Sequence, residues 1–278
     1  MDVFMADLGF IEGPVVARDG SIIVTAIDRG VLHSIRNGSA SVLAELGGGP
    51  NGATEGVGGE IFVTQNGGSW PATNAKRAPP GIQVVKSNGA VRMLTDKPCS
   101  PNDLAFGPNG LLYITDPTRK PERDDGRIWT IDVSNGECWL LLTCDWYPNG
   151  IGFSHKHDCF YVADSRNKRI VRYPLHSPSA HNMEVVFTLT RGSPDGFAFD
   201  GAGNMVIACP GTETVPGTVQ VWSLDGKLLE MIEVGTSRFY TNLAISADAK
   251  LYLCDSSSGC ILRRDWPSPG LALHPFRD

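Results

Sequence analysis

The sequence has few charged residues and no excess of positive ones. Charged side chains make up 19% of its 278 residues, and 24 Lys and Arg stand against 30 Asp and Glu, for a net charge of −6. Without a basic surplus the chain has little to neutralise backbone phosphates, so nucleic acid is excluded as its main partner. No apolar run approaches the roughly 20 residues of a membrane-spanning helix, so no membrane partner is expected.

Paired cysteines and targeting signals are also missing. The seven cysteines are an odd number and include no CxxC pair, which favours reduced, mostly buried thiols. The N-terminal residues lack the basic and apolar regions of a secretory signal. The sequence therefore predicts a cytoplasmic protein with a small-molecule partner, and it leaves the oligomeric state open.

The 3.6-residue apolar period of a helix is nearly absent, and short β-rich runs separated by Gly, Pro, Asn and Asp replace it. One pattern recurs six times, roughly 46 residues apart: a polar residue, a short apolar stretch, a turn and a β-rich run. Its copies start at Glu12, Asn51, Asn102, Asn149, Asp195 and Asn242. A period in the forties with about four strands per repeat is the length of a propeller blade.

We therefore predict an all-β protein, a six-bladed β-propeller with four-stranded antiparallel blades around a central channel. The repeats fill the chain, so residues 1–278 are expected to form a single domain. A sandwich or a closed barrel does not predict such a period. The ring is expected to close where the strand Val3–Met5 pairs with Cys260–Arg264 of the sixth unit.

The repeated polar residue opens the innermost strand of each blade, so the six side chains should converge on the propeller axis at one face. Two are carboxylates, from Glu12 and Asp195, and four are amides. Such oxygen ligands suit a hard divalent cation, whose charge two carboxylates would balance. For any single copy, Asn or Asp beside Gly is also an ordinary turn former, and that alternative stays open.

At these residues the sequence resembles the regucalcin (senescence marker protein)/gluconolactonase-like family, which is related to diisopropylfluorophosphatase. The resemblance covers essentially the whole chain. Four motifs carry it: Ile11-Glu12-Gly13-Pro14, Ser100-Pro101-Asn102-Asp103, Pro148-Asn149-Gly150 and Ser193-Pro194-Asp195-Gly196. It implies a six-bladed propeller and a metal-dependent hydrolase, commonly a lactonase.

The resemblance also implies roles for particular residues. Glu12, Asn149 and Asp195 match metal ligands, and Asn102 matches an asparagine that binds the metal directly or through water. Asp195 further matches the carboxylate that acts as general base or nucleophile. The expected cofactor is one divalent ion, Ca²⁺ first, with Mn²⁺, Zn²⁺, Mg²⁺ and Fe²⁺ as alternatives. Ser100 departs from the Arg that sugar lactonases of this family often carry there, which puts a polyhydroxylated sugar lactone in doubt.

Loops that leave the second strands should overhang the axial ring, and three of them are long: 65–80, 116–125 and 209–217. Together with the approaches to the inner strands they supply the expected substrate-binding residues. These are Asn51, Asn66, Trp70, Ser100, Arg119, Trp146, Tyr147, Tyr240 and Asn242. For Trp146, Tyr147 and Tyr240, a role in filling the junctions between blades is an equal alternative.

The leading hypothesis is a metal-dependent hydrolase of a small lactone or related cyclic ester. In it Asp195 takes a proton from the attacking water and Asn102 orients water or substrate. One alternative is hydrolysis of a phosphoric ester with Asp195 as nucleophile. Another is a ligand-binding propeller without catalysis, which needs neither a held metal nor carboxylates at the axis.

Overall fold

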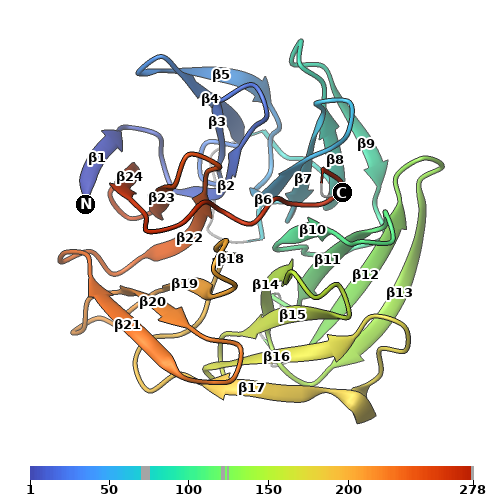
Figure 1. The fold of residues 1–278 in the computed structure, drawn as a ribbon. Helices are drawn as coiled ribbons and strands as arrows, with labels where there is room; N and C mark the ends of the chain where they lie inside the picture. The colour runs from blue at the N-terminus through green and yellow to red at the C-terminus, as the bar shows by residue number, and fades with distance from the viewer. Residues whose placement is uncertain (70–75, 120–122, 124, 277–278) are drawn as a thin grey trace.

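The chain forms a ring of β-sheets in the computed structural model, which describes residues 1–69, 76–119, 123 and 125–276. In these residues twenty-four strands make six four-stranded antiparallel sheets, and one short 3-10 turn, η1 (Ala180–Asn182), lies between two of the strands. The sheets stand around a common axis as propeller blades (Figure 1), so the predicted six-bladed all-β propeller is confirmed. No helix within the described ranges is long and apolar enough to cross a membrane.

The first three blades follow one another along the chain, each running from the axis outward. Blade 1 consists of β2 (Ile11–Val16), β3 (Ile22–Ala26), β4 (Val31–Arg36) and β5 (Ser39–Glu45). Blade 2 consists of β6 (Pro50–Glu55), β7 (Ile61–Gln65), β8 (Gly81–Val85) and β9 (Val91–Thr95). Blade 3 consists of β10 (Leu104–Phe106), β11 (Leu112–Pro117), β12 (Gly126–Asp132) and β13 (Glu137–Cys144).

The remaining blades repeat this order, and the last one closes the ring. Blade 4 consists of β14 (Pro148–Phe153), β15 (Cys159–Asp164), β16 (Arg169–Pro174) and β17 (Glu184–Thr188). Blade 5 consists of β18 (Phe197–Phe199), β19 (Met205–Cys209), β20 (Thr218–Trp222) and β21 (Leu228–Glu233). Blade 6 combines β22 (Tyr240–Ile245), β23 (Lys250–Asp255) and β24 (Cys260–Asp265) with the N-terminal β1 (Asp2–Met5).

The N-terminal strand joins the two ends of the ring. In blade 6, β1 pairs antiparallel with β24, with Val3 opposite Leu262 and Met5 opposite Ile261. The predicted pairing of Val3–Met5 with Cys260–Arg264 is therefore confirmed. Because the first and last segments of the chain share one sheet, the β-ladder of the last blade is completed only when both are in place.

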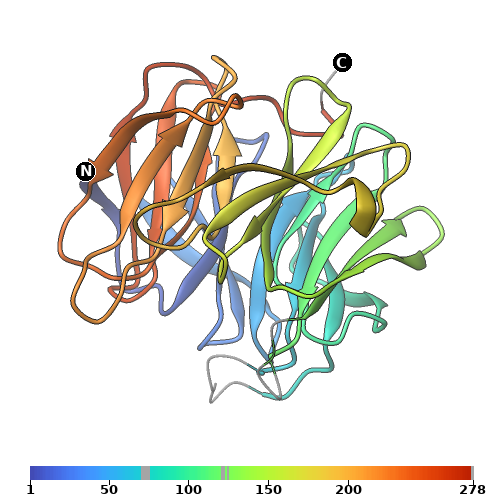
Figure 2. The same cartoon turned by 90° about the horizontal axis from the view of Figure 1, so that it is seen from below.

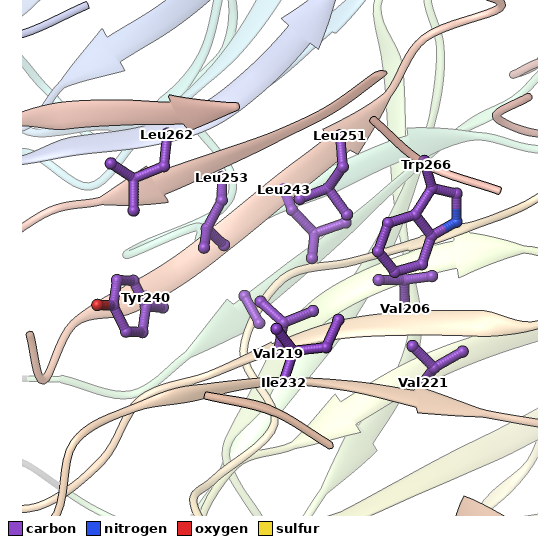
Figure 3. Packing of buried hydrophobic residues seen from close by; sticks show 11 residues of the cluster. Val206, Val219, Val221, Ile232, Tyr240, Leu243, Leu251, Leu253, Leu262 and Trp266 are labelled. Carbon is purple, nitrogen blue, oxygen red and sulfur yellow. The ribbon is translucent and has the colours of Figure 1, made fainter. Parts of the chain in front are cut away.

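The hydrophobic core lies between the blades rather than at the axis. Six clusters of buried apolar side chains fill the ring, and each is built from two neighbouring blades. Figure 3 shows the layer between blades 5 and 6, where Val219 and Ile232 face Leu243 and Leu253. Both faces of the second strands are covered in this way, which explains their continuous runs of β-branched and aromatic residues. Because apolar side chains fill the spaces between blades, polar side chains lie mainly at the axis and at the rims.

The innermost strands are irregular where their repeated polar residues lie. Pairing with the second strand shifts register between Glu12 and Val15 in blade 1, and in the same way in blades 2, 4 and 6. In blades 3 and 5 the regular strand begins two residues after the polar residue. Bulges of this kind re-aim side chains and are frequent next to functional sites.

A C-terminal segment crosses the end of the axis where the inner strands finish. Gly270 forms a bridge with Asp200 near the end of β18, and His274 forms one with Phe106 at the end of β10. Figure 1 shows this segment passing over the middle of the ring, and Figure 2 shows the strands of the ring from the side. The repeated polar residues stand at the starts of the inner strands, so they lie at the other end of the axis.

Candidate functional site

A cavity of about 320 Å³ opens on the axis where the inner strands begin. Five of the six repeated polar residues line it: Glu12, Asn51, Asn102, Asn149 and Asp195. The sixth, Asn242, donates a hydrogen bond from Nδ2 to Oε2 of Glu12 at 3.0 Å. The structure thus brings together side chains that are spread over more than two hundred residues of sequence.

Glycines directly after the ring residues allow this convergence. A Cβ on Gly150 would come closer than 3.0 Å to the backbone oxygen of Asp195, and one on Gly196 would come equally close to the side chain of Asn242. In the four blades that carry glycine after the ring residue, the inner strand can therefore approach the next one only without a side chain at this position. The Asn-Gly and Asp-Gly pairs serve close packing at the axis.

Glu12 is held from several sides although it is a buried carboxylate, 6% exposed. Its Oε2 accepts hydrogen bonds from the backbone N–H of Gly13 at 2.8 Å and from Asn242. Burial raises the pKa of Glu12, and the hydrogen bonds and the positive charge of Arg119 oppose that rise. The carboxylate is therefore fixed in place while its charge is only partly compensated.

Asp103 adds a third carboxylate to the axis. It accepts a hydrogen bond from the N–H of Leu104 at 2.8 Å, and it lies against Gly52 of the neighbouring blade. Burial, and then the negative charge of Glu12, raise its pKa from 3.8 to about 7. From the sequence alone, Asp103 can be interpreted either as a residue that orients ring groups or as one that stabilises a turn. A sharper signal was available, because the position after the ring residue is Gly in four repeats and Asp only in this one.

Asp195 shares the same environment. Burial raises its pKa well above the ordinary value, and the charges of Glu12 and Asp103 raise it further, while a hydrogen bond from Asn149 and the charge of Arg119 act in the opposite sense. Three acidic groups with raised pKa values thus meet at one end of the axis. A cluster of this kind is typical of a site that binds a cation or handles protons.

The donor set fits a hard divalent cation. Carboxylate oxygens of Glu12 and Asp195 and amide groups of Asn102 and Asn149 line one small cavity, and buried carboxylates are costly without a positive partner. Within the described part of the chain, no group of three or more His, Cys, Asp or Glu side chains is placed to hold a metal by itself. A cation on the axis would therefore also rely on asparagine oxygens.

Arg119 enters the cavity from the loop after β11 and is only 9% exposed. Its Nη1 donates to the backbone oxygen of Ser100 and, at 2.9 Å, to the Ser100 hydroxyl, and its Nε donates to the hydroxyl of Tyr147 at 3.1 Å. Ser100 is itself fixed by Asp116, whose Oδ1 accepts the Ser100 N–H at 2.7 Å. A guanidinium therefore lies beside Ser100 although position 100 carries no arginine.

Several residues expected to bind substrate lie elsewhere. Trp146 and Tyr240, each 2% exposed, belong to the apolar layers between blades 3 and 4 and between blades 5 and 6, and neither lines the axial cavity. For both, the prediction of a cavity wall is wrong and the alternative of a filled blade junction describes them. Asn66 is buried and does not line the cavity; its Oδ1 accepts the N–H groups of Gly68 and Ser69 in a turn. Trp70 lies outside the described residues.

The cavity also has lining residues that the sequence did not single out as binding residues. Ser165 accepts a hydrogen bond from Nδ2 of Asn149 at 3.0 Å and donates to the carbonyl of Pro194 at 2.7 Å, so it links two ring segments. Arg166, Thr241, Phe10 and Phe239 also line the cavity. Except for Thr241, which lies within β22, these residues follow a second strand or precede an inner strand, and that place in the repeat is the signal that could have identified them.

Fold and site together define a class: a six-bladed propeller with an acidic, oxygen-lined cavity at one end of its axis. The sequence profile of the SMP-30/gluconolactonase/LRE-like region matches residues 10–266. The chain therefore belongs to the SMP-30/gluconolactonase/LRE-like family, and the resemblance seen in the sequence motifs is confirmed.

Individual relatives are distant. The pentonolactonase XacC of Haloferax volcanii is 27% identical over 149 residues, covering 52% of this chain and 49% of its own. The gluconolactonase of Zymomonas mobilis is 24% identical over 274 residues, which cover 84% of this chain and 72% of that protein. The chain spans about half the length of the first curated relatives it matches.

The fold is shared more closely than the sequence. The crystal structure of regucalcin, a calcium-binding protein from Agrobacterium tumefaciens, superposes with a TM-score of 0.80 at 20% identity, covering 99% of this chain and 96% of that one. A likeness at this level of identity establishes the common fold of the two proteins.

Proposed function

We propose that this protein is a metal-dependent hydrolase of a small lactone or related cyclic ester. The observation that carries the proposal is the convergence of Glu12, Asn102, Asn149 and Asp195 on one small axial cavity. Membership of a family that includes proteins named gluconolactonase and pentonolactonase supports it. A volume of about 320 Å³ suits a small molecule.

The cation would be bound by oxygen atoms of the ring. A divalent ion, with Ca²⁺ proposed first, would polarise the substrate carbonyl as a Lewis acid when bound. The residues that would hold it are Glu12, Asn149, Asp195 and Asn102. Asn242 and Gly13 keep the Glu12 carboxylate oriented through their hydrogen bonds to Oε2, and Ser165 does the same for the Asn149 amide.

Asp195 is the proposed general base. It accepts a proton from water as the water oxygen bonds to the carbonyl carbon. The ring C–O bond then breaks, and the leaving oxygen takes the proton from Asp195 to give a hydroxy acid. Burial and the neighbouring acids raise the pKa of Asp195 in the metal-free protein, and the charge of a bound cation would act in the opposite direction. Asn102 and Asn51 lie where they can orient water or substrate.

The Asp195→Asn variant tests this role. We expect kcat/KM on a panel of lactones, followed by pH-stat, to fall by about 10²–10⁴-fold, the usual contribution of a general base. Asp225→Asn makes the same change in an exposed turn and is expected to leave the rate unaltered. Unchanged hydrolysis by Asp195→Asn, with metal content retained by elemental analysis, would refute the assignment. Incorporation of ¹⁸O into Asp195 in a single turnover would instead identify a nucleophile.

A further inference from the structure

The axial cavity has two walls of opposite character. Arg119, Tyr147 and Arg166 line the side formed by blades 3 and 4, whereas Phe10, Ile27 and Phe239 line the side formed by blades 1 and 6. In a ring of six blades these two junctions lie across the axis from each other. A ligand in the cavity therefore meets a basic wall on one side, an apolar wall on the other, and the acidic ring at the base.

The basic wall is built around Tyr147. The Cζ atom of Arg119 lies 6.0 Å from the centroid of its ring and that of Arg166 lies 5.3 Å away, both within cation–π range. The Tyr147 hydroxyl accepts a hydrogen bond from Nε of Arg119, so its own proton is available to a ligand. The hydrogen bonds of Arg119 use Nε and Nη1. Within the described part of the chain, Nη2 of Arg119 has no hydrogen-bond partner and can therefore donate to a ligand.

The position of Arg119 is pre-organised. Both the carbonyl and the hydroxyl of Ser100 accept from its Nη1, and burial of the residue restricts other rotamers. A guanidinium fixed in this way loses little entropy when a planar oxyanion binds to it. Arg166 is exposed at the rim and can contact the same group from the solvent side.

The apolar wall consists of aromatic and aliphatic surface. Phe10 and Phe239 meet edge to face with centroids 6.0 Å apart, and Ile27 beside them is fully buried. These side chains offer no hydrogen bonds to hydroxyl groups, so polar substituents of a ligand would lose solvation there. This half of the cavity favours a hydrocarbon portion.

We infer that the substrate is an amphipathic lactone that carries a carboxylate, with the carboxylate bound by Arg119, Tyr147 and Arg166 and an apolar portion against Phe10 and Phe239. The guanidinium groups of the basic wall attract the carboxylate, so the charged end is directed away from the base of the cavity. The ester carbonyl is thereby left over the ring. This inference rests on the proposed lactone hydrolysis and specifies its substrate class.

The test compares matched ligands and matched variants. Lactones that carry an alkyl group and either a carboxylate or the corresponding carboxamide are hydrolysed by the wild type and by Arg166→Gln, Arg119→Gln and Tyr147→Phe. Hydrogen bonds to a charged group are worth enough to give about a 10- to 100-fold preference in kcat/KM for the carboxylate. We expect Arg166→Gln to remove much of this preference by lowering the rate for the carboxylate substrate more than the rate for the carboxamide. Arg119→Gln is expected to lower both rates, because its charge also acts on Glu12 and Asp195, and to reduce the preference further.

The control is Arg172→Gln. Like Arg166, Arg172 belongs to blade 4, but it forms an ion pair with Glu184 on the outer strands. This variant is expected to keep the preference. Equal hydrolysis of carboxylate and carboxamide by the wild type, or a preference that survives both arginine changes, would overturn the inference and leave lactone hydrolysis standing.

A binding measurement separates the two proposals. The hydroxy-dicarboxylate product and its monoamide are titrated into the wild type and Arg166→Gln by calorimetry. Suppose that no lactone is hydrolysed, but that the wild type binds the dicarboxylate at least tenfold more tightly than the monoamide and Arg166→Gln does not. The hydrolase proposal then fails, and the proposed anion-binding wall is supported. Equal binding of the two ligands contradicts the wall irrespective of catalysis. Because Arg166 is exposed, this variant is expected to fold normally.

Discussion

At the scale of single residues, the axis of this propeller concentrates negative charge that Arg119 compensates only in part. Glu12, Asp103 and Asp195 come from three different blades, and mutual repulsion adds to burial in raising the pKa values of Asp103 and Asp195. Arg119 is a positive group that acts on Glu12 and Asp195 from the cavity wall. The remaining negative charge has a cost in stability, and a bound cation would offset it.

This charge predicts how stability depends on pH and on metal. Between about pH 4 and 7 the folded protein keeps a proton on Asp103 that the unfolded chain has lost, since the pKa rises from 3.8 to about 7 on folding. The folded state therefore binds more protons in this window, and stability falls as pH rises through it. We expect the melting temperature of chelator-treated protein to drop from pH 5 to pH 8, as measured by calorimetry.

Ca²⁺ at about 100 times its dissociation constant should restore roughly 2.7 kcal/mol at pH 8, and less at pH 5, where protons compete for the same carboxylates. Asp103→Asn should flatten the pH dependence, whereas Glu213→Gln, a change at an exposed loop, should leave it intact. A melting temperature at pH 8 that is the same with and without the divalent ion would contradict a cation site on the axis.

At the scale of elements, a threonine on the second strand ties neighbouring blades together in the first half of the ring. Thr25, Thr64 and Thr115 occupy the same register, and each donates its hydroxyl proton to the carbonyl of the next ring residue along the chain. The acceptors are Asn51, Asn102 and Asn149, at 2.5, 2.6 and 2.7 Å. The equivalent positions in the other blades are Ala163, Ala208 and Cys254. These bonds set the distance between adjacent ring residues.

Replacing one of these hydroxyls tests the tie. Thr64→Val keeps the shape of the side chain but removes the donor to Asn102 and the acceptor of the Gly52 N–H at 2.7 Å. We expect a loss of about 1–2 kcal/mol in urea unfolding and a lower kcat/KM, because Asn102 is no longer held. Thr188→Val on an exposed outer strand is the control. Wild-type stability in Thr64→Val would show that the hydrogen bond from Thr64 to Asn102 does not stabilise the fold.

At the scale of the whole molecule, closure by β1 makes the last blade depend on the first residues of the chain. We propose that the ring unfolds as one domain over residues 1–278. Phe4 of β1 packs edge to face on Tyr252 at 5.3 Å, and Arg263 lies over its ring at 4.9 Å. These contacts join the N-terminal strand to two strands of blade 6.

Loss of this closure should destabilise the whole ring. Phe4→Ala is expected to lower the free energy of unfolding by about 1–2 kcal/mol, and deletion of residues 1–6 by more, each with one cooperative transition by circular dichroism and fluorescence. Val57→Ala, at a side chain 68% exposed, should have no measurable effect. Two separate transitions in Phe4→Ala, or melting unchanged by the deletion, would argue against closure as the basis of a single folding unit.

Prediction from the sequence succeeded for features that recur once in every blade. The inner-strand position of Glu12 and its five counterparts, the four-stranded units and the pairing of β1 with β24 all follow from period and strand pattern. It failed where the direction of a side chain was needed. Trp146 and Tyr240 closely precede the ring residues Asn149 and Asn242 in the sequence, but their side chains lie in the layers between blades.

The repeat pattern predicts the six blades, the all-β architecture and the axial position of the six ring residues, because apolar alternation and turn residues are local properties of each strand and hairpin. The electrostatics and the shape of the cavity depend on the tertiary structure. Arg119 reaches the side of Ser100 because the antiparallel pairing of β10 and β11 brings the segment before β10 beside the loop after β11. Asp103 becomes a member of the acidic group because blades that are distant in sequence meet at the axis. The two unlike walls arise in the same way, since closing the ring sets blades 3 and 4 across the axis from blades 6 and 1.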